Sequence, residues 1–372
     1  MACSFQPEIN LDEWSEKLFA PLKGRRYPLG ASIELTERCN LDCVHCYIKQ
    51  PASNQAIKAQ ELSGSDWVGL IDQVTDKGCL FLVITGGEPL LHPDFIKIFK
   101  HARERGLLIS LFSNATMFSP EIVDTLAAYN LNSLEVTLYG ATQETYEKVT
   151  GIPGSFNRCL HGIELALERE IPVALKSVLL SINQHELEVM KHLAKDYHLD
   201  FRYDGILWPR LDGDQSPMRY KISQEALLNL DHEDQERLES WRITADQFTG
   251  NFLRSEYVFT CGAAQRSFHI DARGRLNPCM MVRKPSYDLR KMKFADAWEK
   301  LGEIRNWKRQ KGTACETCSV NTLCSQCPGW SLAINEDYET HVPEICEIGK
   351  KRAENILQMT LNNKKMESIG HG

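Results

Sequence analysis

Three cysteines lie within eight residues in the stretch Cys39-Asn-Leu-Asp-Cys43-Val-His-Cys46, just after an apolar run. Thiolates at this spacing can each hold one iron of a [4Fe-4S] cube, which has four irons. The stretch has no fourth thiol, so one iron stays open for another ligand. A zinc site or a cluster of free thiols is the alternative, and a count of three thiols argues against zinc, which takes four ligands.

A second element follows about forty residues later, after an apolar run at 80–84, and reads Thr85-Gly86-Gly87-Glu88-Pro89-Leu90. Gly86 and Gly87 suit a tight backbone turn that leaves room for a ligand. The carboxylate of Glu88 can accept a hydrogen bond from an ammonium group. Alone, such a Gly-Gly-Glu segment is more often an ordinary turn. After a strand and about forty residues past the cysteines, it supports their interpretation as ligands of an iron-sulfur cluster.

Together the two motifs resemble the radical S-adenosylmethionine superfamily, whose loop reads Cys-x3-Cys-x2-Cys with an aromatic ring before the last cysteine. His45 takes the place of that ring here. The resemblance implies that the amino and carboxylate groups of S-adenosylmethionine chelate the open iron. One electron then splits the cofactor into methionine and a 5′-deoxyadenosyl radical, which abstracts hydrogen from a substrate.

The resemblance implies further contacts to S-adenosylmethionine. Asn114 lies in a segment like the family's Thr-Asn-Gly turn, although an Asn that only tolerates left-handed geometry is an equal alternative. Thr137 stands where many relatives have a Ser that reaches the ribose, and Arg158 where they place a cation near the methionine carboxylate. A surface arginine is the alternative for Arg158. The expected cofactor-binding residues are His45, Gly86, Gly87, Glu88, Asn114, Thr137 and Arg158.

Seven more cysteines follow residue 260, namely Cys261, Cys279, Cys315, Cys318, Cys324, Cys327 and Cys346. Two Cys-x2-Cys pairs alone suggest a zinc ribbon. The Gly-x4-Cys element at 274–279, the five-residue gap and the distant last cysteine instead resemble the SPASM domain of peptide-modifying radical enzymes. That resemblance implies two auxiliary iron-sulfur clusters, expected to be [4Fe-4S].

The same resemblance implies that the cysteines of the two auxiliary clusters are interleaved along the sequence. Four cysteines fully ligate one auxiliary cluster, and these are Cys315, Cys318, Cys324 and Cys346. The cluster nearer the barrel receives Cys261, Cys279 and Cys327, which is one thiol short. Either an iron stays open or a residue such as His269 or Asp271 completes the set. The remaining cysteines are expected to be structural, and these are Cys3, Cys79 and Cys159.

Strand-like apolar runs alternate with helical patterns from about residue 31 to 208, which predicts six βα units around a parallel sheet. The runs are 32–35, 80–84, 107–112, 133–138, 172–179 and 201–207. The resemblance implies a partial (β/α)6 TIM-like barrel with a C-terminal SPASM domain. In such architectures the ligand lies at the carboxyl ends of the strands, and each motif follows a strand. Three further pocket candidates near strand ends are Tyr139, Asp204 and Asp212, and the equal alternative for each is a loop residue that is solvated or hydrogen-bonded locally.

Shifts in composition set the expected domain boundaries. They are an N-terminal arm at 1–30, the barrel at 31–208, a helical bridge at 209–255, the SPASM domain at 256–350, and a C-terminal helix and tail at 351–372. An arm of this length is too short for the winged-helix domain with which some relatives recognise peptides. A separate protein is therefore expected to supply that function if it is needed.

Charge and hydropathy exclude two classes of partner. The net charge of −7, without a basic run, argues against nucleic acid, and no apolar segment is long enough for a membrane span. The N-terminus lacks the pattern of a secretory signal, so a cytoplasmic location is expected. Because stable disulfides are rare there, thirteen cysteines point to metal.

The sequence therefore predicts a radical S-adenosylmethionine oxidoreductase. A ribosomally made precursor peptide, oxidised or cross-linked through a thioether or carbon-carbon bond, is the first choice of substrate, with a flavodoxin or ferredoxin as electron donor. Sulfatase maturases carry an Asp where Met280 stands, which argues against that branch. The alternatives are tailoring of a small molecule such as a tetrapyrrole or an alcohol, and, from another class, a zinc-ribbon binding protein. No catalytic acid or base is identified.

Overall fold

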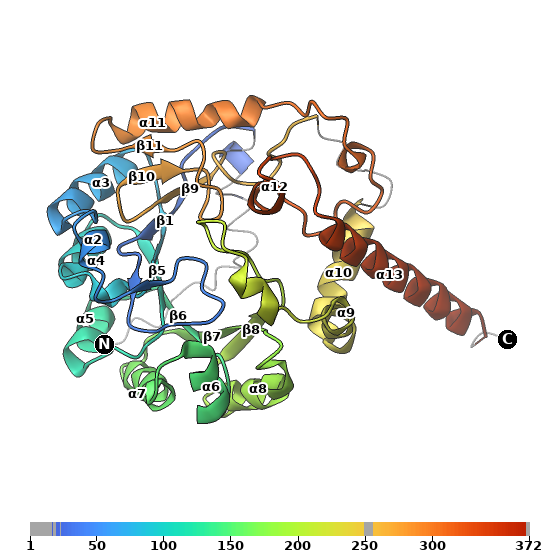
Figure 1. The fold of residues 1–372 in the computed structure, drawn as a ribbon, viewed down its shortest axis with the longest axis horizontal. Helices are drawn as coiled ribbons and strands as arrows, with labels where there is room; N and C mark the ends of the chain where they lie inside the picture. The colour runs from blue at the N-terminus through green and yellow to red at the C-terminus, as the bar shows by residue number, and fades with distance from the viewer. Residues whose placement is uncertain (1–16, 18–19, 23, 249–255, 370–372) are drawn as a thin grey trace, which may run out of the picture.

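One nine-stranded sheet, in the order β11-β10-β9-β1-β4-β5-β6-β7-β8, forms the frame of the protein, and helices cover its outer face (Figure 1). The computed structural model describes residues 17, 20–22, 24–248 and 256–369, with the backbone alone at 246–248 and 357–369. Cys3 and most of the expected arm lie outside the described residues.

Six consecutive strands of the sheet are parallel and form the partial barrel. They are β1 (Gly30–Glu34), β4 (Phe81–Thr85), β5 (Leu108–Ser113), β6 (Ser133–Thr137), β7 (Val173–Val178) and β8 (Asp200–Asp204). All six predicted strands are confirmed. The last ends three residues before the predicted Leu207, because the Asp204 carboxylate accepts a hydrogen bond from the Ile206 backbone and turns the chain.

The helices of the barrel begin at residues that favour helix starts. Ser63 and Asp66 form a capping box before α3, and Ser119 caps α5 with Pro120 in its first turn. The barrel helices are α2 (Gln55–Lys58), α3 (Gly64–Asp76), α4 (Phe95–Glu104), α5 (Pro120–Ala128), α6 (Gln143–Thr150), α7 (Ser155–Leu167) and α8 (Leu187–Asp196). They follow the strands as the alternating pattern predicts.

The two faces of the barrel strands differ in chemistry, since successive side chains point to opposite faces. One face is apolar, and Ile84, Leu111 and Val136 on it are fully buried in the main hydrophobic core. The other face turns into the partial barrel and carries ion pairs of Glu135 with Lys176 and with Arg202. The strands therefore carry an apolar core on one side and charge on the other.

The cysteine-rich C-terminal region continues the same sheet. Strand β9 (Ser267–Ile270) pairs in parallel with β1, and β10 (Arg275–Asn277) pairs antiparallel with both β9 and β11 (Tyr287–Asp288). The expected boundary at residue 256 thus separates two parts of the chain that share one sheet. Both parts can therefore contribute walls to one site.

The remaining helices pack around this joint frame, apart from the long C-terminal helix α13, part of which projects away from the rest (Figure 1). The larger ones are α9 (Gln224–Glu233), α10 (Gln235–Phe248), α11 (Phe294–Leu301), α12 (Pro328–Asn335) and α13 (Pro343–Ile369). The short elements are β2 (Arg38–Cys39), β3 (Gln50–Pro51), η1 (Ala20–Leu22), η2 (Pro89–Leu91), η3 (Gln184–Glu186), η4 (Ser216–Tyr220), η5 (Gly302–Asn306) and η6 (Ala314–Glu316). None of the described helices has the length and apolar content needed to cross a membrane.

Substitution of two glycines within helices, Gly162 and Gly69, tests how tightly the barrel is packed. A Cβ at Gly162 in α7 would stand 2.1 Å from the carbonyl oxygen of Ala115, whereas nothing lies within 4 Å of a Cβ at Gly69 in α3. We expect Gly162→Ala to lower the free energy of unfolding by about 1–3 kcal/mol, because the backbone must shift. Gly69→Ala should raise it by up to about 1 kcal/mol, since alanine favours helix. Melting followed by circular dichroism measures both, and equal midpoints would contradict the packing described.

Candidate active site

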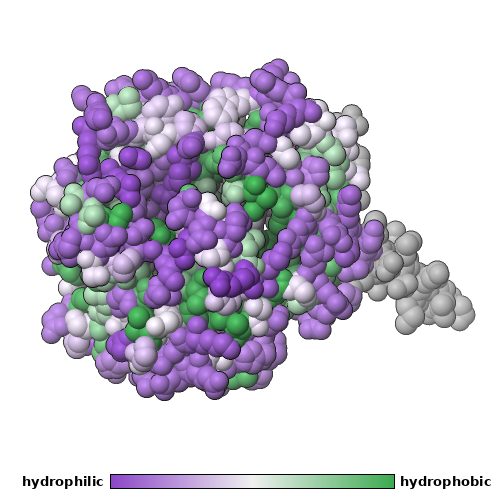
Figure 2. Space-filling view, viewed as in Figure 1, coloured by the Kyte–Doolittle hydropathy of each residue, from purple (hydrophilic) through white to green (hydrophobic). Residues whose placement is uncertain are grey.

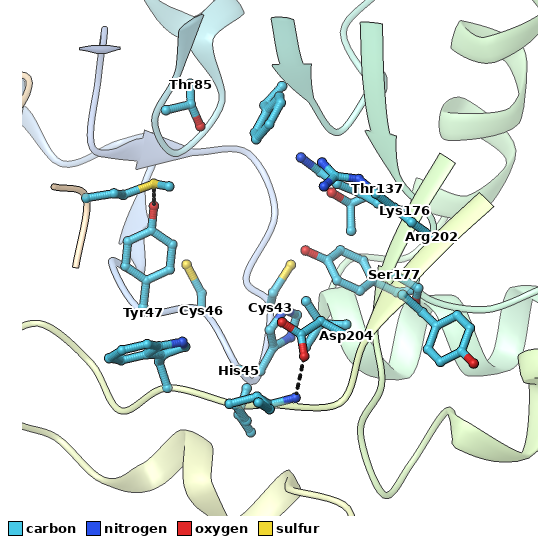
Figure 3. Close-up of a pocket in the computed structure, with 18 of the residues that line it drawn as sticks. Cys43, His45, Cys46, Tyr47, Thr85, Thr137, Lys176, Ser177, Arg202 and Asp204 are labelled. Carbon is cyan, nitrogen blue, oxygen red and sulfur yellow. Dashed lines mark hydrogen bonds between the residues drawn. The ribbon is translucent and has the colours of Figure 1, made fainter. Parts of the chain in front are cut away.

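A cavity of about 730 Å³ opens at the carboxyl ends of the parallel strands, between the cysteine loop (residues 39–46) and the C-terminal region (Figure 3). In Figure 2 apolar side chains reach the surface near the middle of the face shown, among a mostly polar exterior. The expected site residues that line the cavity are Cys39, Cys43, His45, Cys46, Gly86, Gly87, Asn114 and Thr137. Tyr139 and Asp204 line it too, whereas Asp212 only closes an exposed turn with Asp214.

The sulfur atoms of the cysteine loop accept hydrogen bonds from nearby N–H groups. The Leu41 amide donates to Cys39 Sγ at 3.4 Å and the Lys49 amide to Cys46 Sγ at 3.2 Å. The side-chain amide of Asn114 lies 3.7 Å from Cys39 Sγ. Such donors stabilise ligand sulfurs and tune the potential of iron-sulfur clusters.

Burial makes the three thiols of this loop poor acids by themselves. It raises the pKa of Cys39 to about 12 and the pKa values of Cys43 and Cys46 above the ordinary value, and neighbouring thiolates add to the effect on Cys39 and Cys43. Thiolates are stable in such a place when a metal supplies positive charge. The donor set therefore fits the iron-sulfur cluster that the sequence predicts.

His45 is buried beside the loop and packs edge-on against Tyr139, with ring centroids 4.9 Å apart. Burial lowers the pKa of His45 to about 4, so the ring is neutral at physiological pH. Its Nδ1 atom is buried and has no hydrogen-bond partner among the described residues. The hydrogen-bonding capacity of this nitrogen is therefore unused by the described residues.

Gly86 and Gly87 allow two backbone segments to lie in contact, namely the turn after β4 and the residues just before the cysteine loop. Gly86 has φ of +141°, and a Cβ there would stand 2.3 Å from the Thr36 carbonyl oxygen. A Cβ at Gly87 would stand 2.2 Å from the Arg38 carbonyl oxygen. These glycines are needed because the turn lies directly against the start of the cysteine loop, in addition to bordering the cavity.

The carboxylate of Glu88 points inward and does not line the cavity. It accepts hydrogen bonds from the Ser113 hydroxyl at 2.9 Å, the Asn114 amide at 2.9 Å and the Leu90 amide at 3.2 Å. Burial raises its pKa to about 7 against these donors. The structure thus joins Glu88 to the turn after β5, and its expected contact with an ammonium group stays a prediction.

Arg158 is not brought into the cavity. It lies exposed in the first turn of α7, with Nη1 3.4 Å from the Pro153 carbonyl oxygen. The cations that do line the cavity were missed in the sequence, and they are Lys176, Arg202, Arg237 and Arg352. The available signal was a cation inside each of two strand runs, since Lys176 lies on β7 and Arg202 lies on β8.

The C-terminal thiols fall into two electrostatic groups. The pKa of Cys279 is raised by burial and then by Cys261 and Cys327. Burial also raises the pKa of Cys324 to about 11, with further contributions from the other group, Cys346, Cys315 and Cys318. This grouping matches the interleaved assignment, which stays a prediction. In the described ranges, no three His, Cys, Asp or Glu side chains are arranged to hold a single metal ion.

The two proposed non-cysteine ligands, His269 and Asp271, contact other residues of the protein. His269 Nδ1 lies 2.8 Å from Ser32 Oγ, and its buried Nε2 lies 3.6 Å from the Glu34 carboxylate without a hydrogen-bond partner among the described residues. Asp271 accepts hydrogen bonds from the Arg273 and Arg275 amides in the turn between β9 and β10. Both side chains thus contact other parts of the protein, and the alternative in which one of them completes the ligand set stays a prediction.

The family comparison agrees with this geometry, since residues 33–194 match the sequence model of the Radical SAM superfamily. The chain is 28% identical over 345 residues to an AdoMet-dependent heme synthase of Methanosarcina barkeri, covering 86% of this chain and 96% of that protein. It is 26% identical over 343 residues to a PqqA peptide cyclase of Xanthomonas euvesicatoria, covering 86% and 88%.

Solved structures share the fold at low identity. Streptococcus suis SuiB bound to the precursor peptide SuiA gives a TM-score of 0.64 at 16% identity, covering 87% of this chain and 78% of SuiB. The structure of anSMEcpe with bound AdoMet and the Cp18Cys peptide gives 0.63 at 16%, covering 90% and 98%. The predicted α/β partial barrel with a cysteine-rich C-terminal region is thereby confirmed.

The contacts of His269 with Ser32 and Glu34 lead to a prediction about the iron content of the protein. We expect His269→Gln to leave the iron content per folded chain unchanged, because its ring contacts Ser32 and Glu34. Cys279→Ala should lower it, since that thiol belongs to a cysteine group. Iron and sulfide are measured after anaerobic purification, with the folded fraction determined by circular dichroism. A loss of iron in His269→Gln equal to that in Cys279→Ala would make His269 a ligand.

Proposed function

Because the chain is a radical S-adenosylmethionine enzyme, we propose that it abstracts hydrogen from a ribosomally made precursor peptide, which is then oxidised or cross-linked. The observation that carries the proposal is the shared cavity. Cys43 and Cys46 line it from the cysteine loop, and Met280 and Ser325 line it from the C-terminal region. A substrate in this cavity therefore lies between the two parts of the chain.

The residues of the cavity have separable tasks in this proposal. Cys39, Cys43 and Cys46 would hold the cluster, which when bound supplies the electron that opens S-adenosylmethionine to a radical. His45 and Thr137 border the same cavity and would orient the nucleoside end through a ring nitrogen and a hydroxyl. Apolar lining from Leu41, Val178 and other residues would keep water from the reacting carbon.

Comparison with relatives supports a peptide substrate. One curated relative is a peptide cyclase, and two structures with the same fold contain bound peptides. The cavity volume is that of a pocket for one small ligand. Since S-adenosylmethionine needs much of that space, a peptide would insert one or two side chains and leave the rest outside. A flavodoxin or ferredoxin would supply the electron.

A second candidate is oxidation of a tetrapyrrole. The observation that favours it is the match to the Methanosarcina barkeri heme synthase, which spans 96% of that protein. The aromatic and thioether side chains of Trp208, Met280 and Met281 in the cavity wall would suit a flat apolar ring. A tetrapyrrole would present its edge to the cofactor.

Release of 5′-deoxyadenosine tests the proposed function. Anaerobic protein with S-adenosylmethionine and dithionite should release it, and Cys43→Ala should reduce the release by about 100-fold or more, because the cluster loses a ligand. Cys79→Ala is the matched control, since Cys79 is a buried thiol on the apolar side of the sheet. Chromatography quantifies the product. Equal release by parent and Cys43→Ala would refute the function.

A further inference from the structure

The cavity presents four cations that the cysteine loop does not use. They form two pairs, and each pair shares one carboxylate. Lys176 and Arg202 both contact Glu135, and Arg237 and Arg352 both contact Asp231. In each pair two positive charges stand against one shared negative charge. The Asp204 carboxylate also lines the cavity and accepts a hydrogen bond from the Ile206 backbone.

One member of the second pair, Arg352, is saturated by the protein. Arg352 donates to Asp231 at 2.8 and 2.7 Å and to the Leu323 carbonyl oxygen at 2.7 Å, and it is 3% exposed. Its guanidinium also lies 3.9 Å from the ring centroid of Trp241. These contacts tie α9, α10 and α13 to the segment before Cys324. Arg352 is therefore structural. Arg237 donates to Asp231 at 2.8 Å and to the Tyr203 carbonyl oxygen at 3.2 Å, and its Nε has no partner among the described residues.

The first pair has donors to spare. Lys176 Nζ contacts Glu135 at 3.2 Å and lies 3.0 Å from the ring centroid of Phe112. Among the described residues, Glu135 is the hydrogen-bond partner of both Lys176 and Arg202. An ammonium has three N–H groups and a guanidinium has five. The protein therefore leaves most donors of this pair unused, and both residues line the cavity.

These cations lie away from the place of the methionine group of S-adenosylmethionine. The family resemblance puts that group at the open iron beside Gly86 and Gly87, at the end of β4. Lys176 is on β7, three strands further along the sheet, and Arg202 is on β8. At about 4.8 Å between strands, the separation along the sheet is about 14 Å or more. This favours an anion other than the methionine carboxylate.

We propose that Lys176 and Arg202 form an anion-binding end of the substrate site and hold a carboxylate of the substrate. The proposal rests on the proposed function and narrows its substrate class to carboxylate-bearing molecules. A carboxylate between an ammonium and a guanidinium accepts charge-assisted hydrogen bonds from both. A peptide offers this group as an acidic side chain, and a tetrapyrrole as a ring substituent.

Binding of matched acid and neutral probes tests this site. The holoenzyme with S-adenosylmethionine is dialysed against a pool of hexapeptides with one glutamate, or the same pool with glutamine instead. A second arm uses iron coproporphyrin III or its neutral methyl ester. We expect about tenfold more retention of the acid form in one arm, which identifies the source of the carboxylate. Absence of a preference in both arms overturns the proposal.

Variants of Lys176, Arg202 and Glu135 should change the preference for the acid probe in opposite directions. Lys176→Gln and Arg202→Gln should each remove most of the preference for the acid probe. Glu135→Gln should increase it, because the competing carboxylate is gone. Arg169→Gln is the control, since it makes the same charge change at an exposed ion pair with Asp124 and leaves the preference intact. A preference that survives in Lys176→Gln and Arg202→Gln overturns the proposal.

Two further measurements separate this proposal from its competitors. The affinity for S-adenosylmethionine should stay within about twofold of the parent in Lys176→Gln. A loss of that affinity with an unchanged probe preference would assign the cation to the cofactor and overturn the proposal. If release of 5′-deoxyadenosine depends on Cys43 while no acid preference exists, the anion site fails and the proposed function stands.

Discussion

The close approach of two backbone segments holds the site together. The Gly87 amide donates to the Thr36 carbonyl oxygen at 2.8 Å, and the Glu88 amide donates to the Arg38 carbonyl oxygen at 2.9 Å. These bonds hold the start of the cysteine loop against the end of β4. Any side chain at Gly86 or Gly87 would meet a carbonyl oxygen, so the pairing requires glycine. The position of the three thiols over the strand ends follows from this contact.

The buried Glu88 side chain links the turn after β4 to the end of the next strand, β5. Its carboxylate accepts hydrogen bonds from Ser113 and Asn114, and the Asn114 side chain in turn lies beside Cys39. A buried carboxylate without such donors would be costly, so these residues stabilise one another. The ends of β4 and β5 and the cysteine loop thereby form one hydrogen-bonded unit. The catalytic cluster would rest on this unit.

A second set of contacts joins the barrel to the C-terminal region. Arg283 binds Glu34 through two hydrogen bonds at 3.1 and 2.7 Å, and despite burial the neighbouring His269 and Arg283 hold the pKa of Glu34 at about 2. The Tyr47 hydroxyl, next to Cys46, contacts the sulfur of Met280, next to Cys279, at 3.1 Å. Such buried pairing fixes the register of the parts it joins. The two cysteine-bearing regions therefore face a common cavity.

The sequence by itself determined the βα units, the cysteine loop and the glycine turn, because strand alternation and cysteine spacing are local properties of the chain. It did not reveal that β9 joins β1, since pairing between residues over two hundred positions apart leaves no local pattern. Tertiary structure alone decided that Glu88 turns inward, that Arg158 lies outside the cavity, and that Lys176 and Arg202 enter it. The direction of a side chain in a partial barrel depends on the neighbours that surround it. Those neighbours come together only when the sheet curves and the C-terminal region packs beside it.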